Sequence, residues 1–257
     1  MSDPYSQYLP DPVGSSRPAQ AAAAPSSWAR LRVTGADAET FLQGQLSCDV
    51  RGPQPRWTSY NSPKGRMLAV LHLARDGQNF DLHLPPALIE PVTRRLRMFV
   101  MRSKVTIETF APRDADDQVA IRARRDLIEA GVPVVYPETQ DRWVAQMANL
   151  DLVGGISFDK GCYTGQEVVA RLHYLGNVKK RLFRVRGHGP APAPGTAIRN
   201  AAGDVQSVGE IVDAIPDGDD RFVASAVLQV ALAQSESLVL ERDTEASLSL
   251  PEAYTYA

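Results

Sequence analysis

Three β-rich runs separated by two tight-turn signals constrain the fold of this chain more than any other feature. The runs cover residues 57–60, 67–74 and 79–84. A turn-rich segment at 61–65 separates the first two runs, and 75–78, which contains Asp-Gly, separates the second two. Asp-Gly between two β-rich runs is a strong hairpin signal. The three runs are therefore predicted to form an antiparallel meander.

Helical and extended patterns flank this meander on both sides. Residues 28–33 alternate apolar and polar side chains, as a half-buried strand does, and a short helix is predicted at 38–43. After the meander, apolar residues at helical spacing predict a helix over 87–102, followed by a strand at 103–110 and a helix at 119–130. This order predicts an α+β fold in which helices cover an antiparallel sheet.

The chain changes character at residue 182. From there, short β-rich runs follow one another between Gly, Pro and Asp turns without intervening helices, which predicts a small β-barrel or sandwich. We therefore expect a folded α+β region at 28–181 and a β-domain at 182–257. Residues 1–27 are rich in Pro, Ser and Ala, bury too little apolar surface to offset their ordering entropy, and are predicted to be a disordered tail.

Composition argues against several functional classes. The formal net charge of -2 over 257 residues argues against a strongly nucleic-acid-binding chain. No apolar run approaches the roughly 20 residues that span a bilayer. Cys48 and Cys162 are too few and too far apart for a disulfide scaffold or a zinc site, and the four histidines lack metal-ligand spacing, so no metal site is expected. The N-terminus lacks the layout of a secretory signal, and the expected location is a reducing cytoplasm.

The stretch Lys-Gly-Cys-Tyr-Thr-Gly-Gln-Glu at 160–167 precedes an apolar, helix-like run. Thr164 and Glu167 have the spacing of a capping box, which predicts a helix N-terminus at Thr164. Cys162 would then lie at the positive end of the helix dipole, which favours a thiolate. Two interpretations stay open: a reactive thiol, or a small buried residue in a tight loop. A Cys–His pair with His173 is not favoured, because the helix carries that residue about three turns away.

Two groups of basic residues each have a functional and a structural interpretation. Arg94, Arg95 and Arg97 lie on the predicted helix, and a solvated helix face is favoured over an anion site. The basic residues between 179 and 186 fit a charged strand edge and the attraction of a polyanion equally well.

The segment 154–167 closely resembles the signature of the YgfZ family. These are folate-binding proteins used in iron–sulfur cluster assembly and repair, and they are related to the aminomethyltransferase (T-protein) of the glycine cleavage system. Weaker matches occur in the family's order at 33–50, 61–67 and 102–105. The resemblance covers roughly residues 28–186 and, more loosely, the β-rich C-terminal part.

The resemblance implies an aminomethyltransferase-like cloverleaf fold around a central cavity for tetrahydrofolate, with a C-terminal β-barrel. It implies that Cys162 is the key functional thiol. It also implies that an indole at Trp28 stacks on the pteridine-like ring. The residues that it implies for binding the cofactor are Trp28, Asn61, Lys64, Arg66, Lys160, Tyr163, Gln166 and Glu167.

The chain departs from the family's pattern in two places. Between Phe110 and Gln118 it lacks much of the middle portion that longer relatives carry, so a reduced middle domain is expected. The stretch before residues 128–131 contains no counterpart of a second folate-contacting tryptophan. The cavity is therefore expected to be more open than in the family.

The function that the resemblance implies is a folate-binding factor for assembly or repair of iron–sulfur enzymes, which supports tRNA modification indirectly. Its expected partners are tetrahydrofolate and iron–sulfur client proteins, whereas membrane association and direct tRNA binding are not expected. A single thiolate is too few ligands for a stable cluster, so any cluster is transient and shared with a partner. The alternative is a tetrahydrofolate-dependent aminomethyltransferase.

Overall fold

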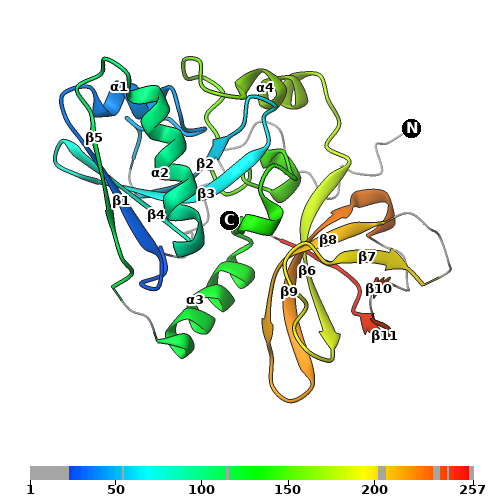
Figure 1. Ribbon diagram of the computed structural model, residues 1–257. Coiled ribbons are helices and arrows are strands. Elements are labelled where there is room, and N and C mark those ends of the chain that lie inside the picture. Colours follow the sequence, from blue (N-terminus) through cyan, green and yellow to red (C-terminus); the bar gives the residue numbers. More distant parts are fainter. Residues whose placement is uncertain are drawn as a thin grey trace.

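The computed structural model describes residues 23–53, 55–113, 116–201, 207–233, 238–241 and 243–254, with the backbone alone for 243–246. A five-stranded sheet with its helices forms the first region, and a β-barrel forms the second (Figure 1). The elements of the first region are β1 (Ala29–Thr34), α1 (Ala38–Gln43), β2 (Arg56–Asn61), β3 (Met67–Asp76), β4 (Asn79–Leu84), α2 (Pro86–Val100), β5 (Thr106–Phe110), α3 (Asp117–Ala130), the 3-10 helices η2 (Pro137–Thr139) and η3 (Ala145–Ala148), and α4 (Gln166–Tyr174).

The first sheet has the strand order β2-β3-β4-β1-β5, with antiparallel neighbours throughout. The meander predicted from the Asp-Gly turn is confirmed, because β2 pairs with β3 and β3 pairs with β4. Helix α2 covers one face of this sheet and buries Leu88, Val92 and Leu96 against it (Figure 1). The other face carries Trp57 and His72, which are paired across β2 and β3.

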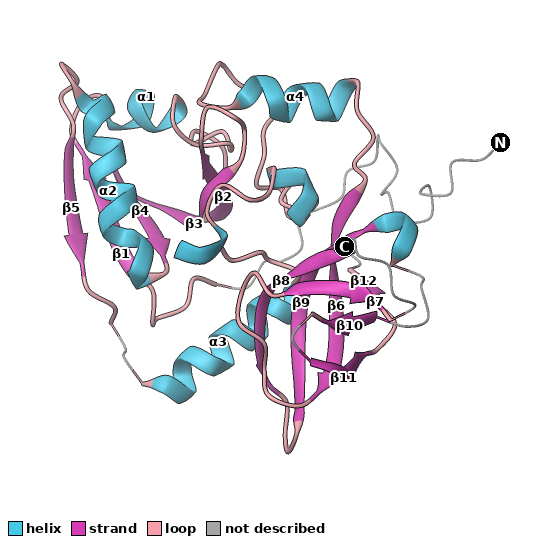
Figure 2. Ribbon diagram, turned by 45° about the vertical axis from the view of Figure 1, so that its right-hand side comes forward, coloured by secondary structure: helices cyan, strands magenta, loops and turns pink. Residues whose placement is uncertain are grey.

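The second region contains β6 (Lys180–His188), β7 (Ala197–Asn200), β8 (Gly209–Pro216), β9 (Arg221–Gln229), η4 (Val230–Leu232), β10 (Leu238–Leu240), β11 (Asp243–Leu248) and β12 (Glu252–Ala253). The strand order β11-β10-β7-β8-β9-β6 is closed into a ring by the pairing of Leu248 with Gly187, and β12 adds to β6 outside the ring (Figure 2). The predicted C-terminal β-barrel is therefore confirmed. Its first strand begins at Lys180, two residues before the expected domain start at 182.

Helix α3 joins the two regions. It follows β5 after a connection of only six residues, 111–116, which is the place where the sequence predicts a reduced middle domain. From α3, Ile128 packs with Ile215 and Val223 of the barrel in a small apolar cluster. Arg124 forms an ion pair with the buried Asp213 of β8.

The predicted disordered tail at 1–27 falls mainly outside the described residues. Its last five residues are described, and Pro25 among them is buried. The Trp28 amide donates to the Pro25 carbonyl at 3.0 Å, and the Arg113 amide donates to the Ser26 carbonyl at 3.1 Å. This segment therefore packs against the start of β1 and the connection that follows β5.

Candidate functional site

The Lys-Gly-Cys loop, residues 160–165, packs with its backbone against the turn between β2 and β3. A Cβ atom on Gly165 would lie 2.5 Å from the Ser62 carbonyl oxygen and 2.8 Å from the Gly65 Cα. Gly65 and Gly165 both adopt positive φ angles, of 70° and 81°, which favour glycine. The structure thereby brings together the turn that carries Asn61, Lys64 and Arg66 and the loop that carries the other motif residues.

Lys160 anchors this loop to the segment after α1. Its Nζ donates to the carbonyl oxygens of Leu46 and Cys48, both at 2.7 Å, and lies 5.0 Å from the centre of the Tyr163 ring. Burial lowers the pKa of Lys160 to about 8. The ammonium therefore holds the loop through backbone carbonyls, and it forms no salt bridge with a carboxylate in the described part of the chain.

The predicted capping box is wrong. Helix α4 begins at Gln166, its N-cap is Gly165 in a left-handed conformation, and no side chain caps it. Instead, the Gln166 Oε1 accepts the Tyr163 amide at 3.2 Å, and the Thr164 amide donates to the Gly44 carbonyl at 3.3 Å. The close contact between the loop and the 61–66 turn requires the glycine conformation, and this contact decides where the helix starts.

The two cysteines differ sharply in exposure. Cys162 is exposed, whereas Cys48 is completely buried beneath the loop, and burial raises the pKa of the Cys48 thiol. The alternative interpretation of Cys162 as a small buried residue is therefore wrong. Its thiol is accessible to a partner or reagent, three residues before the N-cap of α4. The Cys–His pair that the sequence does not favour gains no support, because His173 stacks on Phe158 with ring centres 3.7 Å apart.

Several polar side-chain atoms near the loop are buried and have no partner among the described residues. Both amide atoms of Asn61, the Tyr163 hydroxyl and the Gln45 Oε1 belong to this group. Burial raises the pKa of Tyr163, so the hydroxyl stays protonated and can donate a hydrogen bond. Buried polar groups are normally satisfied by protein or water. This concentration of unsatisfied atoms is the kind of environment that accepts polar atoms of a ligand or ordered waters.

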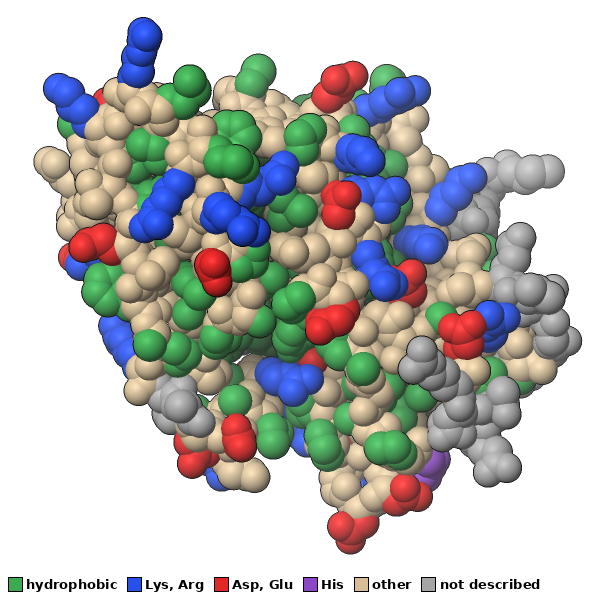
Figure 3. Space-filling view, viewed as in Figure 1, with side chains coloured by type: hydrophobic (Ala, Val, Ile, Leu, Met, Phe, Trp, Pro, Cys, Tyr) green, Lys and Arg blue, Asp and Glu red, His purple; other side chains and the backbone are tan. Residues whose placement is uncertain are grey.

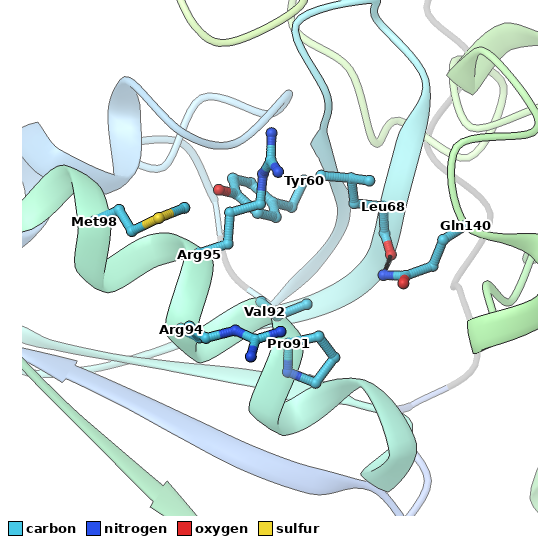
Figure 4. A pocket seen from close by; sticks show the side chains of 8 residues that line it. All are labelled: Tyr60, Leu68, Pro91, Val92, Arg94, Arg95, Met98 and Gln140. Carbon is cyan, nitrogen blue, oxygen red and sulfur yellow. Dashed lines mark hydrogen bonds between the residues drawn. The ribbon is translucent and has the colours of Figure 1, made fainter.

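A cavity of about 270 Å³ opens between α2 and the β2–β3 hairpin. Leu68, Val92 and Pro91 form its apolar walls, and the remaining lining residues are Tyr60, Arg94, Arg95, Met98 and Gln140. Figure 4 shows Arg95 beside the Tyr60 ring and Gln140 approaching from the opposite side, where its Nε2 donates to the Leu68 carbonyl at 2.8 Å.

Two arginines of the α2 basic group also line this cavity, and the exposed Arg94 and Arg97 agree with the favoured interpretation of a solvated helix face. Arg94 and Arg95 line the cavity, and within the described ranges neither forms an ion pair. The Nε of Arg95 is buried without a hydrogen-bond partner there. Arg97, by contrast, uses its guanidinium in a local contact, donating to the Ile107 carbonyl at 2.9 Å. In the space-filling view, Lys and Arg side chains extend across this face over α2, β2 and β3 (Figure 3).

Trp28 does not join the loop or this cavity. It lies against Trp57, with ring centres 5.7 Å apart, and Trp57 in turn contacts His72. Side chains alternate between faces along a strand, so Trp57 and the cavity residue Tyr60 point to opposite faces of the sheet. Trp28 therefore belongs to the face of the sheet opposite α2. The sequence did not indicate that Tyr60 and Gln140 line a cavity. The only signal near Tyr60 was the turn motif Pro63-Lys64-Gly65, which follows it in the chain.

The basic segment 179–186 is largely neutralised by neighbours. Arg181 forms an ion pair with Asp151 at 2.8 Å, Arg184 pairs with Glu129 and Glu252, and Arg186 pairs with Asp217 at 3.1 Å. These ion pairs argue against a free polyanion site. The predicted charged strand edge is also wrong, because β6 pairs with β9 on one side and with β11 and β12 on the other. Among the described residues, no group of His, Cys, Asp and Glu is arranged to hold a metal ion, and no helix is long and apolar enough to cross a membrane.

Comparison with known proteins gives a consistent picture. No protein-family model matches the chain. The tRNA-modifying protein YgfZ of Escherichia coli O157:H7 (strain EC4115 / EHEC) is 27% identical over 292 aligned positions, which cover 87% of this chain and 89% of the relative. The protein of the same name from Cronobacter sakazakii (strain ATCC BAA-894) is 26% identical, with coverages of 78% and 82%. The solved structure of glycine cleavage system aminomethyltransferase T from Bartonella henselae superposes with a TM-score of 0.65 at 13% identity, covering 91% of this chain and 85% of that one.

The sheet, its covering helices and the barrel therefore define a protein with the aminomethyltransferase T fold. Within this class the chain is similar over most of its length to the YgfZ proteins, as its Lys-Gly-Cys loop predicts.

Proposed function

We propose that this protein is a folate-binding factor that supports the assembly or repair of iron–sulfur enzymes, and through them tRNA modification. The observations that carry the proposal are the exposed Cys162 on a loop fixed by Lys160 and, between α2 and the β2–β3 hairpin, a cavity whose two arginines form no ion pair with any described acid. The names of its homologues connect the proposal to tRNA modification.

The residues around the cavity fit a tetrahydrofolate. Apolar walls from Leu68, Pro91 and Val92 suit a flat ring, and Arg94 and Arg95 suit the carboxylates of a glutamate tail. Asn61, which follows the lining residue Tyr60 in the chain, and Tyr163 of the loop carry buried polar atoms without a partner among the described residues. At about 270 Å³, the cavity lies just below the roughly 300–1,000 Å³ of typical ligand pockets. It would enclose one portion of the cofactor, with the remainder at the open side.

The proposal assigns separate tasks to the loop residues. Lys160, Gly165 and Gln166 position the loop through backbone contacts, so they would act on Cys162 indirectly. The thiol of Cys162 would meet the client enzyme, because it is exposed and the other cysteine is not. One thiolate supplies one of the four ligands that a cluster ordinarily requires, so the client would supply the others.

Calorimetric titration with tetrahydrofolate tests the cofactor. We expect saturable binding to the wild type, weakened by Arg94→Gln and unchanged by the matched control Arg199→Gln on the barrel. Absence of binding to the wild type would remove folate from the proposal.

Complementation tests the thiol. In a strain that lacks this protein, we expect reduced activity of iron–sulfur enzymes, restored by the wild type and by the buried-site control Cys48→Ala, but not by Cys162→Ser. Full restoration by Cys162→Ser would exclude a role for the thiol.

The aminomethyltransferase alternative is supported by the fold. Against it, none of the described cavity-lining residues is a carboxylate. Two acidic residues neighbour lining residues along the chain. Glu90 precedes Pro91, and Asp141 follows Gln140 and accepts at its Oδ1 a hydrogen bond of 2.6 Å from the Ser62 hydroxyl. Formation of methylene-tetrahydrofolate from an aminomethyl donor, lost in Asp141→Asn, would favour the transferase.

A further inference from the structure

The C-terminal end of α2 exposes a group of large apolar side chains. Met98, Phe99 and Met101 are 62%, 42% and 87% exposed. We call residues 97–104, which include all three, the α2 tip. Single apolar side chains are ordinary at a protein surface, whereas a cluster within four consecutive residues marks a surface that another molecule covers.

The surroundings of these apolar side chains are basic. Residues 91–107 contain five Lys and Arg and no Asp or Glu. Among the described residues none of the five forms an ion pair, and the nearby Asp37 carboxylate accepts the Lys104 amide at 2.7 Å. Figure 3 shows Lys and Arg side chains over α2 with hydrophobic side chains between them. The α2 tip therefore combines exposed apolar surface with unbalanced positive charge.

This combination indicates the chemistry of the occupant. A solvated helix face accounts for the arginines, but it does not account for the apolar side chains between them. Methionine is flexible and polarizable, and it is frequent on surfaces that adapt to protein partners. RNA would match the charge, but RNA bases stack on flat rings, and Phe99 is the one aromatic residue of the tip. A segment with both apolar and acidic side chains matches the charge and the apolar surface together.

We propose that the α2 tip is a docking site for a partner protein, which contributes an acidic segment with apolar side chains along one face of a helix. The apolar face would cover the three apolar side chains of the tip, and the acidic side chains would meet its cations. The proposal does not rest on folate binding, because Met98 is the one residue of the tip that lines the cavity beside α2.

Fluorescence anisotropy with two labelled peptides of about 18 residues tests the proposal on the full chain. The first peptide places Leu along one face of a helix and Glu elsewhere, and the second has the same composition with Leu spread around the helix. We expect saturable binding of the first peptide and binding of the second that is about tenfold weaker or less, because the second matches only the charge of the tip.

Exposed positions provide the variants and their matched controls. Met101→Gln should weaken binding of the first peptide about threefold, and Arg102→Glu about tenfold or more. Leu250→Gln and Arg221→Glu, at exposed residues of the barrel, should leave it unchanged. Unchanged thermal melting, followed by circular dichroism, shows that each variant is folded. Tetrahydrofolate binding should be the same in Met101→Gln as in the wild type, which separates this proposal from the folate proposal.

Three results would overturn the proposal. The first is equal binding of the two peptides, and the second is equal behaviour of the tip variants and the barrel controls. The third is a different occupant: single-stranded RNA or phosphatidylserine vesicles that bind the tip more tightly than the first peptide, or self-association of the chain that Arg102→Glu abolishes.

Discussion

Gly65 and Gly165 approach each other so closely that neither position has room for a side chain. A Cβ on Gly65 would lie 3.0 Å from the Gly165 carbonyl oxygen and 2.7 Å from the Val168 Cβ. This contact joins the turn of the β2–β3 hairpin to the loop that carries Cys162, although about 100 residues separate them in sequence. It fixes the geometry of the proposed site.

Gly165→Ala is expected to destabilise the protein by about 2 kcal/mol or more, because the new methyl group combines a left-handed backbone with a steric overlap. Gly161→Ala, in the same loop, should change stability by no more than about 0.5 kcal/mol, since no atom lies within 4 Å of the position that a Cβ would occupy there. Chemical denaturation measures both. Equal effects would show that the backbone contact does not constrain the loop.

Lys160→Met is expected to lower the free energy of unfolding by about 1–3 kcal/mol, because the carbonyl oxygens of Leu46 and Cys48 lose their buried donor.

The same substitution should also release the loop from the segment after α1, which thiol labelling can detect. In the folded wild type, a thiol reagent should label Cys162 rapidly and Cys48 only after unfolding. Lys160→Met should allow labelling of Cys48 under native conditions. Continued protection of Cys48 would show that Lys160 is not the anchor of this segment.

Folding stability should decrease as the pH falls from about 6.5 towards 4. Burial lowers the pKa of His72 to about 4, whereas the unfolded chain titrates near 6.5, so the unfolded state binds more protons in this window. The contribution of His72 is on the order of 3 kcal/mol, fully present above pH 6.5 and lost progressively below it. His72→Phe should flatten the stability profile between pH 4 and 6.5. The exposed His188→Gln serves as control, and a profile that is equally steep in His72→Phe would contradict the assignment.

The ion pair of Arg124 with the buried Asp213 can be compared with an exposed ion pair on the same strand of the barrel. Arg124→Ala leaves the carboxylate of Asp213, which is 1% exposed, without its partner and should cost about 3–5 kcal/mol. Arg142→Ala removes an exposed ion pair to Glu210 on the same strand and should cost about 0–1 kcal/mol. Thermal and urea unfolding measure both variants. Similar costs would indicate that Asp213 finds another partner when Arg124 is absent.

Much of the fold follows from local signals in the sequence. The Asp-Gly turn at 76–77 and the alternation in β1 predict the sheet, and the short runs after residue 182 predict the barrel. Local signals failed at the start of α4, where Thr164 and Glu167 have the spacing of a cap. Contact with a distant turn overrode this local preference and moved the cap to Gly165.

The candidate site was predictable only in part. The Lys-Gly-Cys loop and the Asn61–Arg66 turn carry recognisable motifs, and the structure brings them together. The cavity at Arg94 and Arg95 depends on how α2 lies across the sheet, which helical periodicity does not specify. The sequence alternation shows that side chains at β1 point to two faces, but it does not say which face α2 covers, so it does not place Trp28.

The barrel ring is closed by one pair of residues, Leu248 with Gly187, contributed by strands at opposite ends of the second region. During synthesis, β6 leaves the ribosome some 60 residues before its ring partner β11. Until then one edge of β6 has no neighbour within the ring, while the sheet of the first region can already be complete. Nascent chains that stall before residue 248 should therefore present an open strand edge to chaperones, and release of this protein from them should coincide with emergence of β11.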